Sequence, residues 1–246
     1  MTPLIAGPLI ASSKNMASSK KNSKAVSSPS HPLPRLYLAT PPVSDPAAFL
    51  SQLPDLLSGF DIAAVLLRLA PSDERGMISR VKAIAPLVQK AGVALLVDQH
   101  EGIVARGGAD GAHVSGLEAM EEARPSLKPD RILGVGALQT RHDAMVAGEN
   151  GADYVLFGEP DAHGARPSAE AIAERLQWWA ELFEPPCVGY AATAEEAAAF
   201  AATGADFIMA AEFVWSDARG PAAALGEAVA AISQGHAEAC AAAGRG

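Results

Sequence analysis

Short apolar runs alternate along the chain with longer stretches in which apolar residues recur every three or four positions, which predicts strands separated by helices. The clearest marker is the tripeptide Gly-Ala-Asp, which precedes an apolar run at Gly108, Gly151 and Gly204. In each copy the glycine suits the left-handed position that ends a helix, and the aspartate suits the turn that follows. Helices that are each followed by a strand are typical of a parallel sheet.

Eight apolar runs of strand length follow one another, each bounded by turn residues or by a helical pattern. They are residues 35–40, 62–69, 93–98, 110–114, 131–136, 153–158, 186–190 and 206–211. Helical patterns lie between them, such as 72–91 with Ser72 as its cap and 168–183 with Ser168 at its start. Eight strands alternating with helices over about 200 residues predict an α/β fold, a single closed (β/α)8 TIM barrel.

The barrel is expected to span residues 35–235, between two segments of different composition. Residues 1–34 are rich in serine and contain four lysines but no acidic residue, so we expect a disordered N-terminal tail. A targeting role is the alternative for this basic, Ser-rich tail, although it has no arginine and no long apolar core. Residues 236–246 are expected to be a flexible C-terminus.

Composition narrows the class of protein. The hydrophobic residues make up 49%, but no apolar run approaches the ~20 residues that span a bilayer. The net charge is −9 although the tail is basic, which argues against a nucleic-acid or anionic-membrane surface on the barrel. With only Cys187 and Cys240 there is no disulfide framework and no paired zinc motif, so we expect a cytoplasmic protein that acts on small molecules. The oligomeric state is left open.

Chemistry in such a barrel sits at the C-terminal ends of the strands. Asp98 ends the third strand and Glu118 follows the fourth, so two carboxylates are expected at one mouth, where they could bind Mg²⁺. Arg68 stands near the end of the second strand and needs an anionic or carbonyl partner. Two plainer interpretations stay open: Asp98 could be the N-cap of the next helix, and His113 a hydrogen-bonded core histidine.

The segment of residues 95–118 resembles the thiamine phosphate synthases and their thiazole tautomerase relatives; it reads LLVDQHEGIVARGGADGAHVSGLE. Residues 133–135 and 151–158 are similar to the fifth and sixth strands of that family, and the likeness extends from Leu36 to Phe213. The resemblance implies a TIM barrel that joins a pyrimidine methyl diphosphate to thiazole phosphate, with release of pyrophosphate, in thiamine biosynthesis.

The same resemblance assigns roles to particular residues. Asp98 and Glu118 fall on the two magnesium ligands of the family, with glutamate in place of the usual aspartate. Arg68 falls on the arginine of the second-strand motif that contacts substrate, and is the expected catalytic residue. The further positions expected to bind substrate are His113, Arg166, Gly189, Ala191 and Ala192.

The chain departs from the family pattern where phosphate groups are bound. Leu66 and Ala70 replace a Gln and a Lys around Arg68, and Ala191-Ala192 stands where a Gly-Gly pair is expected. Each replacement removes a hydrogen-bond donor or narrows the approach of the backbone to an anion. We therefore expect a weak synthase, and two alternatives stay open: a non-catalytic or regulatory ligand-binding barrel, and a thiazole tautomerase-like relative.

Overall fold

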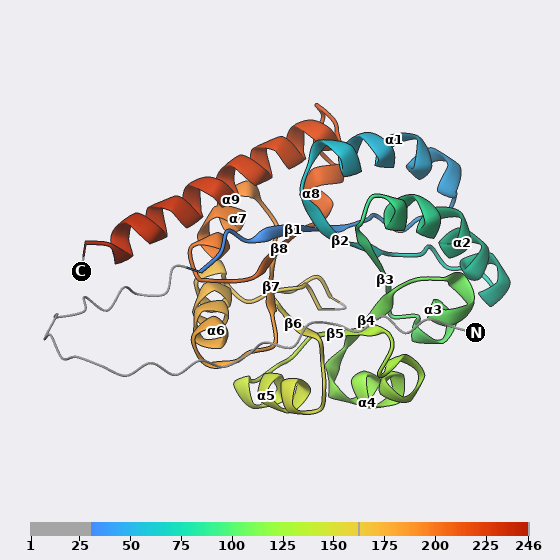
Figure 1. Ribbon diagram of the computed structural model, residues 1–246, viewed down its shortest axis with the longest axis horizontal. Coiled ribbons are helices and arrows are strands. Elements are labelled where there is room, and N and C mark those ends of the chain that lie inside the picture. Colours follow the sequence, from blue (N-terminus) through green and yellow to red (C-terminus); the bar gives the residue numbers. More distant parts are fainter. Residues whose placement is uncertain (1–30, 162, 246) are drawn as a thin grey trace, which may run out of the picture.

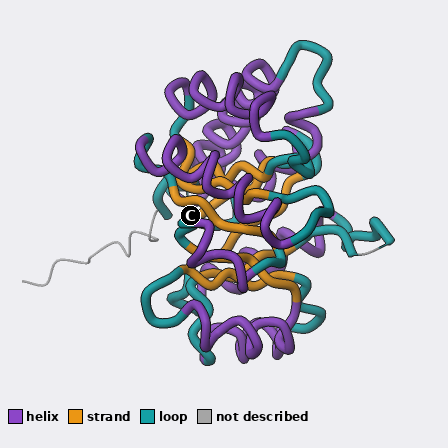
Figure 2. The backbone as a smooth tube through the Cα atoms, turned by 90° about the vertical axis from the view of Figure 1, so that its right-hand side faces the viewer, coloured by secondary structure: helices purple, strands orange, loops and turns teal. Residues whose placement is uncertain are grey.

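A computed structural model describes residues 31–161 and 163–245. Within them eight parallel strands pair in chain order and close into a barrel, because β1 pairs with β8 as well as with β2. Figure 2 shows the strands as an inner group with helices packed around it. The strands are β1 (Arg35–Ala39), β2 (Ile62–Leu67), β3 (Ala94–Asp98), β4 (Gly111–Ser115), β5 (Ile132–Gly136), β6 (Tyr154–Phe157), β7 (Cys187–Ala191) and β8 (Phe207–Ala210).

The helices follow the strands in turn, and the last of them extends well past the barrel (Figure 1). They are α1 (Pro46–Gly59), α2 (Glu74–Lys90), α3 (Glu101–Gly107), α4 (Gly116–Leu127), α5 (Arg141–Glu149), α6 (Ala169–Leu182), α7 (Ala194–Ala201), α8 (Glu212–Trp215) and α9 (Pro221–Ala243). The predicted fold class is confirmed, and each strand lies at its predicted place with its ends shifted by at most two residues.

Of the two N-cap residues predicted from the sequence, the structure confirms one and contradicts the other. Ser168 caps α6, because its hydroxyl accepts a hydrogen bond from the backbone N–H of Ala171 at 3.3 Å. Ser72 does not cap α2. The cap is Asp73, whose carboxylate accepts from the N–H of Gly76 at 2.9 Å, so the helix begins at Glu74.

The glycines of the repeated Gly-Ala-Asp take the predicted left-handed conformation, with φ of 80° at Gly108, 92° at Gly151 and 88° at Gly204. A side chain with a Cβ is strained in this region of φ, so the glycine permits the sharp exit from each helix.

The aspartates of the repeat do more than form a turn, because each accepts a hydrogen bond from a backbone N–H at the start of the neighbouring strand. The pairs are Asp110 with Leu95 at 2.7 Å, Asp153 with Leu133 at 2.7 Å and Asp206 with Cys187 at 2.9 Å. Each aspartate therefore fixes the strand that follows it against the strand beside it, at the N-terminal rim of the barrel.

Two apolar cores result from this arrangement. The larger lies between the strands and the surrounding helices. The smaller fills the barrel and is composed of Tyr37, Ala39, Leu66, Leu96, Tyr154, Leu156, Val188, Tyr190, Met209 and Ala211. Its three tyrosines bring hydroxyl groups into an otherwise apolar interior, and every buried side-chain N or O atom of the described residues has a hydrogen-bond partner.

The ends of the barrel differ in detail from the expected boundaries. Residues 1–30 of the expected tail lie outside the described residues. Closer to β1, Pro34 is buried and the carbonyl of His31 accepts a hydrogen bond from His236 at 2.8 Å. The expected barrel end at Gly235 falls inside α9, which continues to Ala243.

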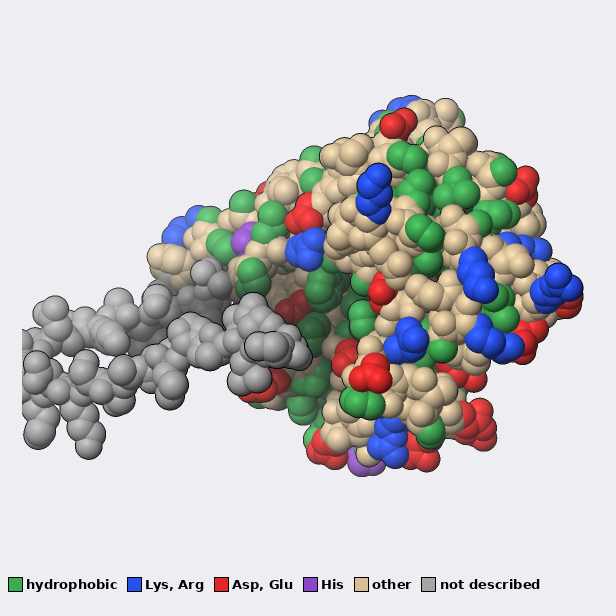
Figure 3. Space-filling view, turned by 45° about the vertical axis from the view of Figure 1, so that its right-hand side comes forward, with side chains coloured by type: hydrophobic (Ala, Val, Ile, Leu, Met, Phe, Trp, Pro, Cys, Tyr) green, Lys and Arg blue, Asp and Glu red, His purple; other side chains and the backbone are tan. Residues whose placement is uncertain are grey.

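The surface shows no concentration of one charge on the face drawn in Figure 3, where acidic and basic side chains are interspersed. Of the helices that the structure describes, none is both long and apolar enough to cross a membrane.

The aspartate–strand contacts generate a stability prediction. Replacing Asp206 by alanine leaves the N–H of Cys187 without its partner, and we expect the free energy of unfolding to fall by about 1–3 kcal/mol. Asp206→Asn retains an acceptor oxygen and should lose less than half as much. Urea denaturation measures both, with exposed Asp130→Ala as the control. Equal stability of the Ala and Asn variants would show that the hydrogen bond contributes little.

Candidate active site at the barrel mouth

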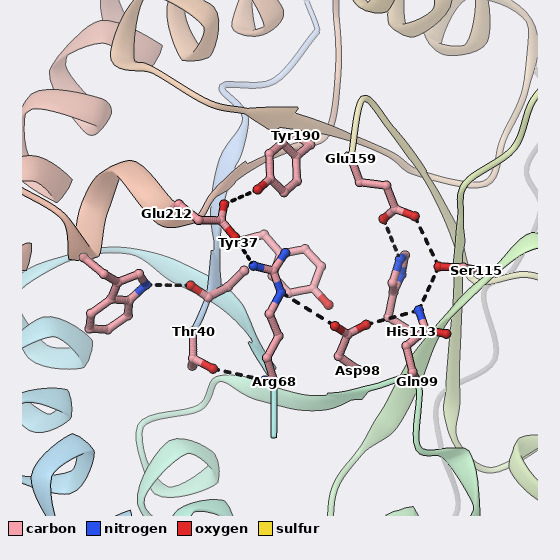
Figure 4. Close-up of polar contacts among 12 residues, drawn as sticks. Tyr37, Thr40, Arg68, Asp98, Gln99, His113, Ser115, Glu159, Tyr190 and Glu212 are labelled. Atoms are coloured by element: carbon pink, nitrogen blue, oxygen red, sulfur yellow. Dashed lines mark hydrogen bonds and ion pairs between the residues drawn. The ribbon is translucent and has the colours of Figure 1, made fainter. Parts of the chain in front are cut away.

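Polar side chains from six of the eight strands, or from the residues shortly after them, converge at the mouth formed by the C-terminal ends of the strands (Figure 4). Arg68 directly follows β2, Asp98 ends β3 and Glu212 begins α8 after β8. The others are His113 of β4, Glu159 after β6 and Tyr190 of β7.

A buried chain of hydrogen bonds connects the barrel interior to this mouth. The hydroxyls of Tyr37 and Tyr154 lie 2.9 Å apart, and Tyr154 Oη lies 3.0 Å from Nδ1 of His113. His113 Nε2 in turn lies 3.1 Å from Oε2 of Glu159. Because both ring nitrogens are bonded and the side chain is 1% exposed, the imidazole is held in one orientation. His113 is therefore a hydrogen-bonded core histidine that also reaches the mouth.

Burial keeps the two interior tyrosines neutral. Desolvation is the main cause that raises the pKa of Tyr37 and the pKa of Tyr154 well above the ordinary value. Both hydroxyls therefore remain available as hydrogen-bond donors and acceptors at neutral pH.

Two glycines of β5 make room for this chain of side chains. A Cβ at Gly134 would lie 2.0 Å from Cζ of Tyr154, and a Cβ at Gly136 would lie 2.6 Å from both carboxylate oxygens of Glu159. The absence of side chains at Gly134 and Gly136 therefore leaves the space that Tyr154 and Glu159 occupy.

Gln99 and Ser115 extend the network along the rim. Gln99 Nε2 donates to Ser115 Oγ at 2.8 Å and to Asp98 Oδ1 at 3.3 Å, and Ser115 Oγ donates to Glu159 Oε1 at 3.4 Å. Gln99 has a φ of 59°, a conformation unusual for a residue with a Cβ. A second such residue, Ala137 with a φ of 52°, follows β5 at the same mouth. Strained backbone positions of this kind cluster at functional sites.

Arg68 lies between two carboxylates. Its Nε is 3.6 Å from Oδ2 of Asp98, and its Nη1 donates to Oε1 of Glu212. The Arg68 side chain is only 20% exposed, whereas that of Glu212 is 65% exposed. The predicted need of Arg68 for an anionic partner is met by these two acids.

The site shifts the pKa values of Asp98 and Glu212 in opposite directions. Burial raises the pKa of Asp98, although the charges of His113 and Arg68 oppose this shift. Burial alone would raise the pKa of Glu212 as well, but the hydrogen bond from Tyr190 and the charge of Arg68 bring it below the ordinary value. Asp98 is not the N-cap of the following helix, because the cap position of α3 is His100 and no side chain bonds there.

Arg166 fastens the loop after β6 to the end of β7. It donates to the carbonyl of Gly158 at 2.7 Å and to the carbonyl of Tyr190 at 2.8 Å, and its Nη2 lies 3.0 Å from Oε2 of Glu196. Oε2 of Glu196 also accepts the backbone N–H of Ala192 at 2.8 Å. The charge of Arg166 and the N–H of Ala192 are thus both satisfied by one carboxylate of the chain itself.

At the other predicted positions of β7, Gly189 and Ala191, the side-chain direction is toward the surrounding helices and not into the barrel. An added Cβ at Gly189 would meet Leu176 and Phe200, which belong to the surrounding helices. Ala191 is buried in the core between strands and helices. It is the Tyr190 side chain that occupies the interior face of the barrel at this height.

Asp98 and Glu118 are the carboxylates that the sequence predicts as ligands of a hard cation. Among the residues that the structure describes, the carboxylate of Asp98 makes only the two long contacts given above, and Glu118 is exposed in the first turn of α4. No three side chains of the types His, Cys, Asp and Glu come together as a complete site among residues 31–161 and 163–245. Mg²⁺ is usually held by one or two carboxylates together with water and substrate phosphate, so the Asp98 carboxylate at the mouth suits a magnesium ion that binds with a phosphorylated ligand.

A cavity of about 270 Å³ opens beside the mouth between the ends of β5 and β6. Ala137, Phe157, Glu159, Arg166 and Arg175 are among its lining residues. Its size is close to the lower end of small-molecule sites, about 300 Å³, so it suits one small ring.

Several mouth residues were not singled out from the sequence. Glu159 could have been found, because it follows the apolar run of β6 and so stands at a strand end. Tyr190 sits inside a strand and Glu196 inside a helix, where no pattern distinguishes a mouth residue from a packed one. Tyr37 and Tyr154 likewise read as ordinary strand residues.

Several known proteins are similar to this chain in sequence or in fold. The family described as thiamine monophosphate synthase matches residues 36–214. A thiamine-phosphate synthase from Rhodospirillum centenum is 41% identical over 196 residues, which cover 78% of this chain and 95% of the relative. One from Hyphomonas neptunium is 39% identical over 208 residues, covering 79% and 91%. Among solved structures, a thiamine phosphate pyrophosphorylase from Pyrococcus furiosus has a TM-score of 0.64 at 20% identity, covers 82% of this chain and 96% of its own, and supports the fold alone.

The close fit of Gly134 against Tyr154 can be tested by substitution. Gly134→Ala forces the Tyr154 ring out of its hydrogen bonds, and we expect a loss of about 1–3 kcal/mol in the free energy of unfolding. The matched control is Gly102→Ala in α3, where an added Cβ meets nothing within 4 Å. The control should be neutral or slightly stabilising in the same urea titration. If Gly134→Ala is as stable as the control, Tyr154 is not held as described.

Proposed function

The chain belongs to the thiamine monophosphate synthase family, and we propose that it joins hydroxymethylpyrimidine diphosphate to thiazole phosphate in thiamine biosynthesis. In this reaction the bond between the pyrimidine methylene carbon and the diphosphate oxygen breaks, a bond from the thiazole to that carbon forms, and pyrophosphate leaves. The observation that carries the proposal is the family match over the whole barrel, with 95% of the Rhodospirillum centenum synthase covered. The mouth supplies charged groups suited to both ends of this reaction.

Arg68 is the residue that we assign to the diphosphate. Its guanidinium is mostly removed from water and is held by Asp98 on one side, so it is oriented before the substrate arrives. A fixed cation close to the leaving group stabilises the negative charge that develops there as the bond breaks.

Positive charge develops on the pyrimidine methylene carbon at the same time. Glu159, with its carboxylate fixed by His113 and Ser115, is the acid that we place on this side of the mouth. His113 serves as a positioning residue, because it links Glu159 to the rigid tyrosines of the barrel interior. Direct binding of substrate by His113, which the sequence led us to expect, is not part of this proposal, because both ring nitrogens are already bonded and the side chain is 1% exposed.

Asp98 and Glu118 would hold the Mg²⁺ on which the family pattern depends. The ion, when bound, neutralises the charge of the diphosphate. Asp98 supplies its carboxylate from the end of β3, and Glu118 supplies its own from the first turn of α4.

The thiazole phosphate is assigned to the side of the mouth built by β6 and β7, next to the cavity of about 270 Å³. Arg166 contributes by holding the two loops together. Gly189, Ala191 and Ala192 contribute by setting the path of β7 and of the chain that leaves it. We also propose a cytoplasmic location, because both cysteines are free thiols.

A ligand-binding barrel without turnover is the second candidate. The observation that favours it is that both arginines of the mouth are already paired with acids of the chain, Arg68 with Glu212 and Arg166 with Glu196. A binding protein would hold its ligand without needing these charges at a leaving group.

The assay that separates the two candidates supplies purified protein with both substrates and Mg²⁺ and measures thiamine phosphate and pyrophosphate. We expect turnover in the wild type, and a fall of about 10²–10³ in rate for Arg68→Gln, because a preoriented cation at the leaving group is lost. Arg106→Gln is the control, since that arginine pairs with Glu74 on the surface. Binding of both substrates with no product would support the ligand-binding barrel instead.

The metal assignment has its own test. Asp98→Asn and Glu118→Gln each remove one charged oxygen, and each should weaken Mg²⁺ binding in the presence of pyrophosphate by about tenfold or more. Titration calorimetry measures the affinity. Glu121→Gln, an exposed acid of the same helix α4, is the matched control and should bind Mg²⁺ as the wild type does. Wild-type affinity in the double variant would show that other groups bind the ion.

A further inference from the structure

Tyr190 presents a fixed hydroxyl to the mouth. Its side chain is 2% exposed, its carbonyl accepts a hydrogen bond from Arg166, and the Arg166 guanidinium lies 5.2 Å from the centre of its ring. Burial, with the neighbouring carboxylate of Glu212, raises the pKa of Tyr190 to about 12, so the hydroxyl keeps its proton. The hydroxyl donates a hydrogen bond to Oε2 of Glu212 (Figure 4).

Glu212 is the exposed member of this cluster. Its side chain is 65% exposed, and it begins a helix of four residues whose preceding residue, Ala211, provides no side-chain cap. Arg68, at 20% exposure, and Tyr190 are packed into the barrel and cannot follow if the glutamate turns toward solvent. The carboxylate is therefore the one partner that can leave.

Departure of the carboxylate would leave two donors directed at one position, the Nη1 group of Arg68 and the hydroxyl of Tyr190. Donors removed from water are costly without an acceptor, so this position favours another anion. A phosphate oxygen makes the same hydrogen bonds as a carboxylate oxygen, and a diphosphate carries more charge than one glutamate.

We propose that the Glu212 carboxylate occupies an anion site from which the substrate diphosphate displaces it, and that the Tyr190 hydroxyl then donates a hydrogen bond to the diphosphate beside Arg68. The inference rests on the proposed function and adds to it a substrate-contacting residue, Tyr190, and a residue that sets affinity, Glu212. An acid that competes for Arg68 weakens anion binding but keeps the guanidinium in place between turnovers.

Glu196, the carboxylate that pairs with Arg166, cannot turn toward solvent as Glu212 can. It is 20% exposed, accepts from both terminal nitrogens of Arg166, and binds the backbone N–H of Ala192 as well. Three hydrogen bonds and its burial make Glu196 a structural partner of Arg166, so the displacement is assigned to Glu212 alone.

The test titrates inorganic pyrophosphate into the protein by calorimetry at constant Mg²⁺. Glu212→Gln removes the competing charge and keeps the shape of the side chain, so we expect binding tighter by about tenfold. Glu212→Ala provides a second variant with the same expectation. Glu195→Gln, an exposed acid of α7, makes the same change in net charge and should stay within about twofold of the wild type, since distant surface charges are screened. Circular dichroism verifies that each variant is folded.

Tyr190→Phe distinguishes displacement from simple repulsion. The proposal requires that Tyr190→Phe combined with Glu212→Gln binds pyrophosphate more weakly than Glu212→Gln alone, by about tenfold, because one donor to the anion is gone. If Glu212→Gln and Glu212→Ala leave the affinity unchanged, Glu212 is not displaced and the inference is wrong. If Tyr190→Phe has no effect in the Glu212→Gln background, Tyr190 does not contact the anion.

The binding measurement needs no turnover, so it separates this inference from the proposed function. The expected affinities without any product would support the anion site and contradict the synthase. Product formation with unchanged affinities in the Glu212 variants would support the synthase and contradict the displacement.

Discussion

The hydrogen bond from a strand N–H to the aspartate of a Gly-Ala-Asp repeat is the constraint on which the barrel depends. It occurs before β4, β6 and β8 and connects each of these strands to its neighbour at the N-terminal rim. A shift of one residue in a strand would turn its inward side chains outward. By fixing where the strands start relative to one another, the repeat also fixes which residues stand at the opposite end, where the mouth is built.

Side chains inside the barrel hold the residues of the mouth in fixed positions. β5 carries two glycines on its inner face, and the space beside them is taken by Tyr154 and by the carboxylate of Glu159. Tyr154 then bonds to Tyr37 and to His113, so a polar side chain at the mouth is supported by aromatic rings deep in the core. Buried polar groups without hydrogen-bond partners would destabilise the core more than apolar side chains would. Every buried side-chain N or O atom of the described residues has such a partner.

Much of the fold could be predicted because its signals are local. The left-handed glycines and the eight apolar runs mark helix ends and strands without any knowledge of tertiary contacts. The N-cap of α2 is Asp73 and not the predicted Ser72, because both residue types are good caps and only the geometry decides between them. The site was partly predictable for the same reason: Arg68 and Asp98 stand at strand ends, and they meet in an ion pair. Tyr190 and Glu196 depend on contacts between β7, α7 and the loop after β6, which no sequence period records.

The charges at the mouth explain how an acidic chain can be built to hold anionic ligands. Its net charge of −9 repels phosphates at long range, so affinity must come from cations that are close, desolvated and correctly oriented. Desolvated arginines are stable only with partners, and this chain supplies those partners itself, Asp98 and Glu212 for Arg68, and Glu196 for Arg166. The difference in freedom between these acids then decides which arginine is open to a ligand. The mostly covered Glu196 keeps Arg166 in its contacts with the carbonyls of Gly158 and Tyr190, whereas the exposed Glu212 leaves Arg68 as the cation that an incoming phosphate can reach.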